Sequence, residues 1–420
     1  MKKLNLTEDW SATIVGLFFI AAALAVFGLS HYVLPTAAFG WDCSADFLAL
    51  FSASNLWRLL LIFAASYALF ALAYALQGKP LADTASYAAV FLLAVVASLI
   101  GGNKIANDWG LDTVIFSLLI GLFIKNVFGT PKWMEKTLVS ELYIKIGLIF
   151  LGATILFQNL LKSGAFGLIQ SVVVVFGVWY FAFWLCKRFK IDKELSVMLS
   201  SAVSICGVSA AIASAGAIKG DPKKLSYVVS LVLIVAVPMI LLMPLSAKWL
   251  CLNETLAGAW IGGTIDTTGA VVATGALYGE EALKTATIVK FSQNVLLGIT
   301  AFFITIYWNY TRQDKTDDTG EKPRLYLIWE RFPKFVLGFI VVSLLFSFFF
   351  AGADYKPVSD SLKKFQNLWF TLGFVSIGLE SDFKALFNKE NSKAALVFLG
   401  AQFFNILFTL LVAYLLFGKL

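Results

Sequence analysis

The chain has 420 residues, of which 59% are apolar and only 14% are charged, and its mean hydropathy is +0.82. This leaves too little polar surface to coat a soluble globule, so the composition excludes a soluble protein and predicts an all-α integral membrane protein. The formal net charge of +7 is typical of basic cytoplasmic loops and does not by itself predict an anionic partner. Four cysteines without metal-ligand spacing and a single histidine give no support for a metal site or a disulfide framework.

Segments of about 20 apolar residues are long enough to cross a bilayer as helices, and the sequence predicts about 13 of them. Lys2 and Lys3 precede the first one, but its apolar core is too long for a signal peptide, so we expect a helix there. In chain order the predicted spans lie near 12–34, 56–77, 85–101, 112–129, 140–160, 165–186, 195–218, 225–250, 256–277, 283–308, 332–351, 362–381 and 393–417.

A long polar stretch, 309–331, predicts a cytoplasmic linker and divides the chain. We expect 1–110 to supply scaffold helices, 111–308 to hold a first repeat and a core of two broken helices, and 332–420 to form a C-terminal repeat.

Basic residues indicate the orientation in the membrane. They concentrate in the linker and in the loop around Lys187, Arg188, Lys190 and Lys193. The positive-inside rule then predicts a cytoplasmic N-terminus, for a multi-pass protein of the bacterial inner membrane.

One passage of small residues occurs twice: 209–221 reads SAAIASAGAIKGD and 268–280 reads TGAVVATGALYGE. Such runs inside apolar spans are typical of the interrupted helices of secondary transporters, where freed backbone groups can contact a solute. A second similarity, between 147–167 and 372–394, joins spans seven apart, which predicts inverted repeats. Whether the two interrupted spans cross the membrane or re-enter it stays open.

Four stretches resemble the YeiH-type putative sulfate exporter family: SICGVSAAIASAGAIKG (204–220), GGTIDTTGAVVATGALYGEEALKTATIVKFSQNVLLG (262–298), FPKFVLGF (332–339) and LGFVSIGLESDFKALF (372–387). This family is similar in pattern to the superfamily of sodium/proton antiporters and bile-acid symporters. The resemblance implies a scaffold, a mobile core of crossed broken helices, an elevator-type motion and a homodimer.

The chain departs from the family pattern beside the second small-residue run. Where the family reads Ile-His-Asp-Thr-Ala-Gln, 265–270 reads Ile-Asp-Thr-Thr-Gly-Ala, and where it reads Val-Val-Lys-Leu-Thr-Arg, 288–293 keeps the lysine as Lys290 but ends in Gln293. The substrate or coupling ion is therefore expected to differ from that of the family's central members.

A helix that restarts inside the membrane offers unpaired N–H groups and a partial positive charge, which suit a carboxylate, sulfonate or sulfate. Close helix packing is the alternative reason for such small residues. The predicted substrate-binding residues are Ser204, Gly207, Ser209, Thr267, Thr268, Gly269, Lys290 and Asn294.

Lys290 is a charge within a predicted span, and such charges normally have a partner. It is predicted either to balance a bound anion or to pair with Asp266, and the two roles are compatible. Asp266 could instead carry a coupling Na⁺ or H⁺, which defines the alternative of a cation/proton antiporter. Most of the amides in apolar runs are expected to make interhelical hydrogen bonds, with Gln293 and Asn294 ranked higher because they adjoin Lys290. These amides are Gln158, Asn159, Gln170, Gln293, Asn294, Gln402 and Asn405.

No GxSxG, HExxH or Walker A pattern occurs, and the histidine is remote from the polar breaks, so we expect neither an enzyme nor a cofactor. Two compact polar breaks suit an occluded site better than a channel. The prediction is a secondary transporter of a small anion (a sulfur oxyanion, a sulfonate or a small carboxylate) with the lipid bilayer and a second copy of the chain as partners and no nucleic acid.

Overall fold

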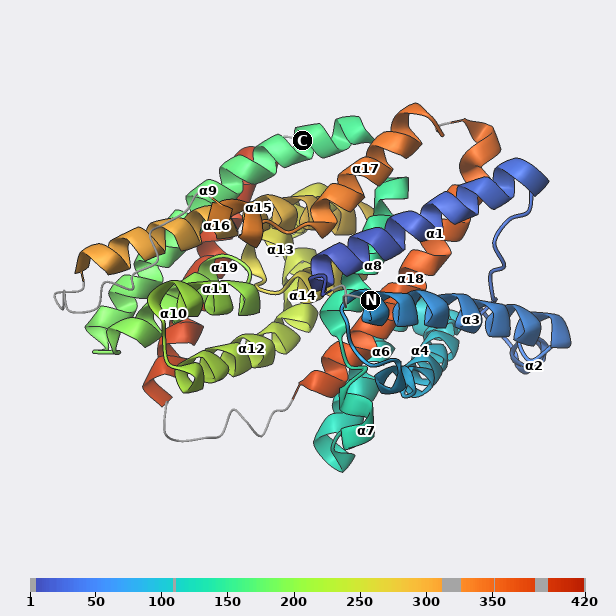
Figure 1. The fold of residues 1–420 in the computed structure, drawn as a ribbon, viewed down its shortest axis with the longest axis horizontal. Coiled ribbons are helices and arrows are strands. Elements are labelled where there is room, and N and C mark those ends of the chain that lie inside the picture. The colour runs from blue at the N-terminus through green and yellow to red at the C-terminus, as the bar shows by residue number, and fades with distance from the viewer. Residues whose placement is uncertain (1–4, 109–110, 312–325, 351, 382–391, 419–420) are drawn as a thin grey trace. The chain divides into compact units, whose positions relative to one another are not determined.

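The computed structural model describes residues 5–108, 111–311, 326–350, 352–381 and 392–418 (Figure 1). Within these ranges the chain forms helices and no β-strand, apart from an isolated bridge between Trp41 and Asn103. The prediction of an all-α protein is confirmed. The central part of the predicted linker, 312–325, lies outside the described residues.

Each predicted span overlaps one helix or a run of consecutive helices, and the span near 140–160 overlaps three. Among the described residues, eight helices are long and apolar enough to cross a membrane, and four shorter apolar helices accompany them. The spans predicted near 195–218 and 256–277 are each two helices separated by three residues, which confirms the prediction of two broken helices.

The chain divides into two compact units that alternate along the sequence. Unit 1 contains 1–159 and 334–382, and unit 2 contains 160–333 and 383–420. The four segments expected from the sequence describe repeats and a linker, and that organisation stays a prediction.

Unit 1 is built around α18, which packs against α4, α6 and α8. The helix α1 packs on α3, α8 and α17. The helices of this unit are α1 (Glu8–Ser30), α2 (Ser44–Ala49), α3 (Ala53–Leu76), α4 (Tyr87–Gly101), α5 (Lys104–Asp108), α6 (Thr113–Phe123), α7 (Lys132–Glu135), α8 (Ser140–Leu151), α17 (Phe335–Phe348) and α18 (Lys356–Glu380), with short helices η1 (Leu81–Thr84), η2 (Ile124–Phe128), η3 (Gly152–Thr154) and η4 (Ala353–Tyr355).

Two glycines set the distance between α6 and α18. A Cβ atom at Gly121 would lie 2.4 Å from the carbonyl oxygen of Val375, and one at Gly378 would lie 2.6 Å from that of Leu118. Small residues at a crossing let two helix backbones approach closely, as in membrane helix pairs.

Unit 2 is built around α15, which packs against α11, α13, α14 and α16. The helix α12 covers α10, α11 and α14, and α19 packs on α10 and α13. The helices are α9 (Phe157–Arg188), whose first residues belong to unit 1, α10 (Lys193–Ser204), α11 (Val208–Ile218), α12 (Pro222–Trp249), α13 (Glu254–Thr264), α14 (Thr268–Tyr278), α15 (Glu280–Thr311), α16 (Tyr326–Arg331) and α19 (Ser392–Phe417).

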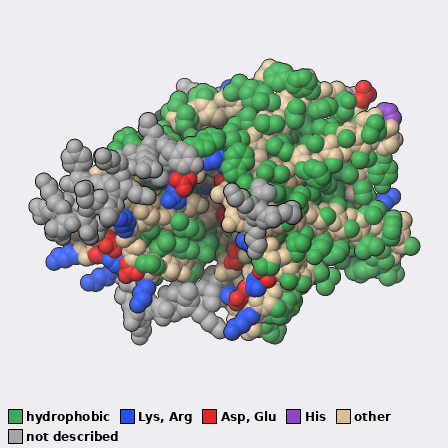
Figure 2. Space-filling view, in the orientation of Figure 1, with side chains coloured by type: hydrophobic (Ala, Val, Ile, Leu, Met, Phe, Trp, Pro, Cys, Tyr) green, Lys and Arg blue, Asp and Glu red, His purple; other side chains and the backbone are tan. Residues whose placement is uncertain are grey.

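Large apolar side chains cover much of the molecular face in Figure 2. On α9 and α19 they are exposed at intervals of three or four residues, which makes a continuous apolar stripe along each helix. Such stripes need an apolar solvent, so they fit helices that face lipid. The exposed residues include Ile169, Val173, Phe176, Tyr180 and Trp184 on α9, and Leu396, Leu399, Phe403, Leu407 and Leu411 on α19.

Candidate functional site

The two breaks in unit 2 have different local causes. Between α10 and α11 the chain turns at Gly207, whose φ of 61° and ψ of −108° are open to glycine and strained for other residues. Between α13 and α14 it becomes extended at Ile265, and the Thr267 hydroxyl then caps α14 by accepting a hydrogen bond from the Ala270 N–H group at 3.3 Å. Each break thus ends one helix and starts another within three residues.

The two breaks lie against each other. A Cβ atom at Gly207 would be 3.1 Å from the Cβ atom of Asp266 and 3.5 Å from Cγ2 of Thr267. It would also be 2.6 Å from Cγ1 of Val232 on α12. A side chain at Gly207 would therefore push the breaks apart, which gives this glycine a packing role as well as a conformational one.

Lys290 on α15 caps the C-terminal ends of α10 and α13, the first halves of the two broken helices. Its side chain is 0% exposed, and Nζ donates hydrogen bonds to the carbonyl oxygens of Ile205 at 2.6 Å and Ile265 at 2.9 Å. A third bond, of 2.7 Å, goes to Oε1 of Gln293 one turn further along α15. Helix C-termini carry partial negative charge, so the ammonium lies where a bound cation would otherwise be stabilised.

Three amide side chains donate to four more carbonyl groups at these ends. Gln293 donates from Nε2 to one carbonyl of α10 and one of α13, at 2.9 and 3.3 Å. From α19, Gln402 donates to the last carbonyl of α13 at 3.1 Å, and Asn405 donates to α10 at 3.2 Å and α13 at 3.0 Å. The acceptors are Ser204 and Gly263 for Gln293, Thr264 for Gln402, and Val203 and Thr264 for Asn405.

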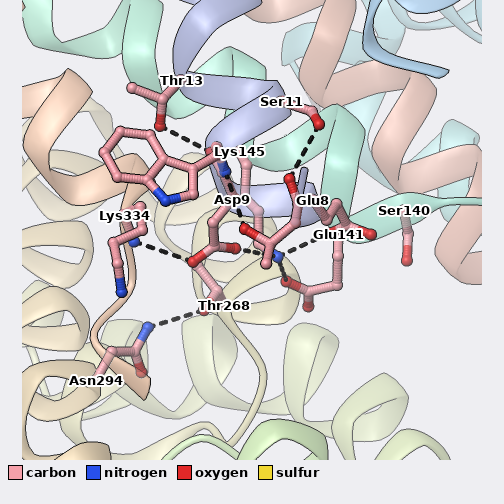
Figure 3. A network of polar contacts seen from close by, with 12 residues as sticks. Glu8, Asp9, Ser11, Thr13, Ser140, Glu141, Lys145, Thr268, Asn294 and Lys334 are labelled. Atoms are coloured by element: carbon pink, nitrogen blue, oxygen red, sulfur yellow. Dashed lines mark hydrogen bonds and ion pairs between the residues drawn. The ribbon is translucent and has the colours of Figure 1, made fainter. Parts of the chain in front are cut away.

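The N-terminal ends of α11 and α14 present a different chemistry. The first N–H groups of each helix have no acceptor within the helix and carry partial positive charge. Asn294 donates from Nδ2 to the Thr268 hydroxyl at 3.3 Å, which joins α15 to the first turn of α14 (Figure 3). Ser209, in the first turn of α11, is exposed.

Several polar atoms around the breaks are buried without a hydrogen-bond partner among the described residues. Asp266 is 2% exposed and Asn294 is 6% exposed, and Oδ2 of the first and Oδ1 of the second have none. The hydroxyls of Thr264 and Thr287 share this property. Buried groups of this kind are rare in folded proteins and call for a functional explanation.

The predicted site residues fall into two groups. Gly207, Ser209, Thr267, Thr268, Gly269 and Asn294 belong to the breaks and to the N-terminal side of α11 and α14. Lys290 and Ser204 lie on the C-terminal side, where the Ser204 hydroxyl donates to the Ser201 carbonyl at 3.4 Å and its own carbonyl accepts from Gln293.

The expected interhelical bonds of Gln293, Gln402 and Asn405 are present. What the sequence analysis missed is that they cap the broken helices. The available signal was the spacing of Gln402 and Asn405, three residues apart in an apolar helix, which places both amides on one face.

Unit 1 holds a charge cluster of its own. Lys145 on α8 pairs with Glu8 at 2.7 Å, Asp9 at 3.0 Å and Glu141 at 3.8 Å (Figure 3). The Asp9 carboxylate also accepts a hydrogen bond from the N–H group of Lys334 at 3.1 Å. These contacts fasten the start of α1 to α8 and to the residue before α17.

The broken helices, their apolar surroundings and the lipid-type surface define a multi-pass membrane protein. The sequence model described as "Conserved hypothetical protein 698" matches residues 86–398. The chain belongs to this family, the YeiH family of UPF0324 membrane proteins.

The relatives share this class. The chain is 38% identical over 360 residues to the UPF0324 membrane protein RB9488 of Rhodopirellula baltica, covering 83% of this chain and 66% of the relative. A UPF0324 membrane protein of Nitratidesulfovibrio vulgaris is 36% identical over 340 residues, covering 78% of this chain and 58% of that protein. UPF0324 membrane protein NE0724 of Nitrosomonas europaea is 28% identical over 456 residues, covering 94% and 92%. The chain thus spans less than two thirds of the first two relatives' length, and no solved structure matches it.

Proposed function

We propose that this protein is a secondary transporter of a small anion, with the anion bound at the N-terminal ends of α11 and α14. The observation that carries the proposal is the division of charge at the two breaks. The C-terminal carbonyl groups already receive hydrogen bonds from Lys290 and three amides. At the N-terminal ends the first N–H groups have no acceptor within their own helix, although Ala270 donates to the Thr267 hydroxyl, and the positive dipole favours an anion.

The residues proposed to contact the anion are those whose donors lie at these ends. Ser209 and Thr268 offer hydroxyls in the first turns of α11 and α14. Gly269 lets the backbone of α14 approach a ligand closely, and Gly207 keeps the two breaks in contact beside it. Lys290 contributes positive charge from behind the site while it holds the carbonyl ends. Sulfur oxyanions, sulfonates and small carboxylates all have compact negative heads that fit this arrangement.

The wider proposal follows the family resemblance: unit 2 carries the site, and transport proceeds by an elevator-type alternation in a homodimer of the bacterial inner membrane, with a cytoplasmic N-terminus. Transport is proposed rather than catalysis, since paired helix breaks of this kind are typical of transporter sites.

A cation/proton antiporter is the second candidate, because one carboxylate oxygen of Asp266 is buried and has no hydrogen-bond partner in the part of the chain that the structure describes. Against it, the ammonium of Lys290 lies at the carbonyl ends where a cation would be expected to bind.

The test is uptake into proteoliposomes and ligand-dependent thermal stabilisation, measured with sulfate, ethanesulfonate and propionate, with and without sodium. A ligand that binds only the folded state raises its stability. We expect Thr268→Val and Asn294→Leu to weaken the response to anions at least tenfold. Thr274→Val is the matched control, since this buried hydroxyl of α14 donates to the Ala270 carbonyl of its own helix. Sodium-dependent or proton-dependent flux without any anion effect would replace this proposal by the antiporter.

A further inference from the structure

The breaks carry two buried acceptor atoms for which the described part of the chain supplies no donor. Within the described ranges, Oδ2 of Asp266 and Oδ1 of Asn294 have no hydrogen-bond partner, and both side chains are more than nine-tenths buried. An ionised carboxylate and an amide oxygen only accept hydrogen bonds. Whatever satisfies them must therefore bring N–H or O–H groups.

These acceptors lie beside the proposed anion site. Asn294 contacts Thr268 through its amide nitrogen, so its oxygen also lies near the first turn of α14. Asp266 directly precedes the cap residue Thr267, and its Cβ atom lies against Gly207 at the start of α11. Positive helix ends and unpaired acceptors thus occur within one small region.

The charges at the breaks disfavour a plain anion. A carboxylate at Asp266 would repel a negative head bound two residues further along the chain, and low polarity strengthens that repulsion. With Asp266 ionised, Asp266 and Lys290 together carry no net charge. A ligand that is also neutral overall, but has separated charges, meets both the positive helix ends and the negative acceptors.

We infer that the ligand is a zwitterion: a compact sulfonate or carboxylate held by the N-terminal N–H groups of α14 and α11, with a protonated amine that donates to Asp266 and Asn294. This inference rests on the proposed anion site and specifies the second half of its ligand. Amino acids and aminosulfonates of short chain length belong to the class.

The experiment compares pairs of probes that share a head group and differ in the amine. Binding of 2-aminoethanesulfonate and ethanesulfonate, and of β-alanine and propionate, is measured by ligand-dependent thermal stabilisation of the full chain. We expect the aminated member of each pair to bind at least tenfold more tightly. Asp266→Asn should reduce that preference to less than threefold, whereas the control Asp360→Asn, an exposed acid on α18, should keep it.

A third probe tests the inference in the unmodified protein, in case Asp266→Asn does not fold. The N,N,N-trimethyl derivative of 2-aminoethanesulfonate keeps the positive charge but has no N–H donor. We expect it to bind at least tenfold more weakly than the primary amine, since the unpaired oxygens would stay without hydrogen bonds.

The outcomes separate the two proposals. Equal binding of aminated and deaminated probes would overturn the zwitterion and leave the anion transporter intact. If neither the aminated nor the deaminated probes bind, and the protein responds to sodium or pH alone, both the zwitterion and the anion transporter would be overturned. Tighter binding of the primary amine than of the deaminated and trimethylated probes would support both the anion site and the zwitterion.

Discussion

Replacing Lys290 by Met should destabilise the protein strongly while keeping the length of the side chain. The change removes the donors to Ile205, Ile265 and Gln293, all at the buried breaks. Leaving a buried acceptor unpaired costs about 1–3 kcal/mol, and the substitution removes the Lys290 donor from three of them. These costs overlap, so we expect a loss of about 3–5 kcal/mol in the free energy of unfolding.

The assay is reversible denaturation of purified protein, with Lys248→Met as control, because Lys248 is exposed near the end of α12. The control should change stability by less than about 0.5 kcal/mol. If Lys290 occupies a cation's place, sodium or ammonium should stabilise the Lys290→Met variant and not the parent protein. At a concentration 100 times the dissociation constant the gain would be about 2.7 kcal/mol.

Two results would refute this reasoning. Equal stability of Lys290→Met and the parent protein would show that the three hydrogen bonds contribute little. A destabilised variant that responds to no small cation would show that the ammonium is a packing element and not a substitute for an ion.

Three further predictions concern packing and capping, each measured by the same denaturation assay. Gly378→Ala should cost at least about 1–3 kcal/mol, because its Cβ atom would lie 2.6 Å from a backbone oxygen of α6; Gly28→Ala on α1, with no atom within 4 Å, should be neutral or stabilising. Glu380→Gln should cost about 1.5–3 kcal/mol, since the carboxylate accepts from the N–H group and hydroxyl of Ser140, at 3.2 and 2.7 Å; an unchanged melting curve would contradict a charged contact there. Asn405→Leu should lower the free energy of unfolding by about 1–3 kcal/mol, because it removes the donor to α10 and α13. The control is Leu407→Asn on the exposed face of α19, and a smaller effect of Asn405→Leu than of this control would contradict the capping role.

The sequence predicted the spans and breaks because their causes are local. Apolar runs of bilayer length give helices, and the small residues around Gly207 and Thr267 supply a left-handed turn and a helix cap within a few positions. The N–H groups and hydroxyls at the start of α14 were predictable for the same reason, since the first residues of any helix have N–H groups without an acceptor in the helix.

The partners at the C-terminal side could not be predicted, because they are remote in sequence. Asn405 lies 202 residues from its acceptor on α10 and 141 from the one on α13. Backbone carbonyls carry no residue-type signature, so nothing in the sequence indicates that Lys290 bonds to two of them. Which face of α15 or α19 meets the breaks depends on the packing of several helices at once.

The ammonium of Lys290 also has a consequence for how the protein responds to its surroundings. A cation attached through a side chain has no dissociation constant, so the two carbonyl ends are occupied at every external salt concentration. The breaks therefore need no ion from solution to stay neutral. Any dependence of transport on a sodium gradient would then have to originate away from these carbonyl groups.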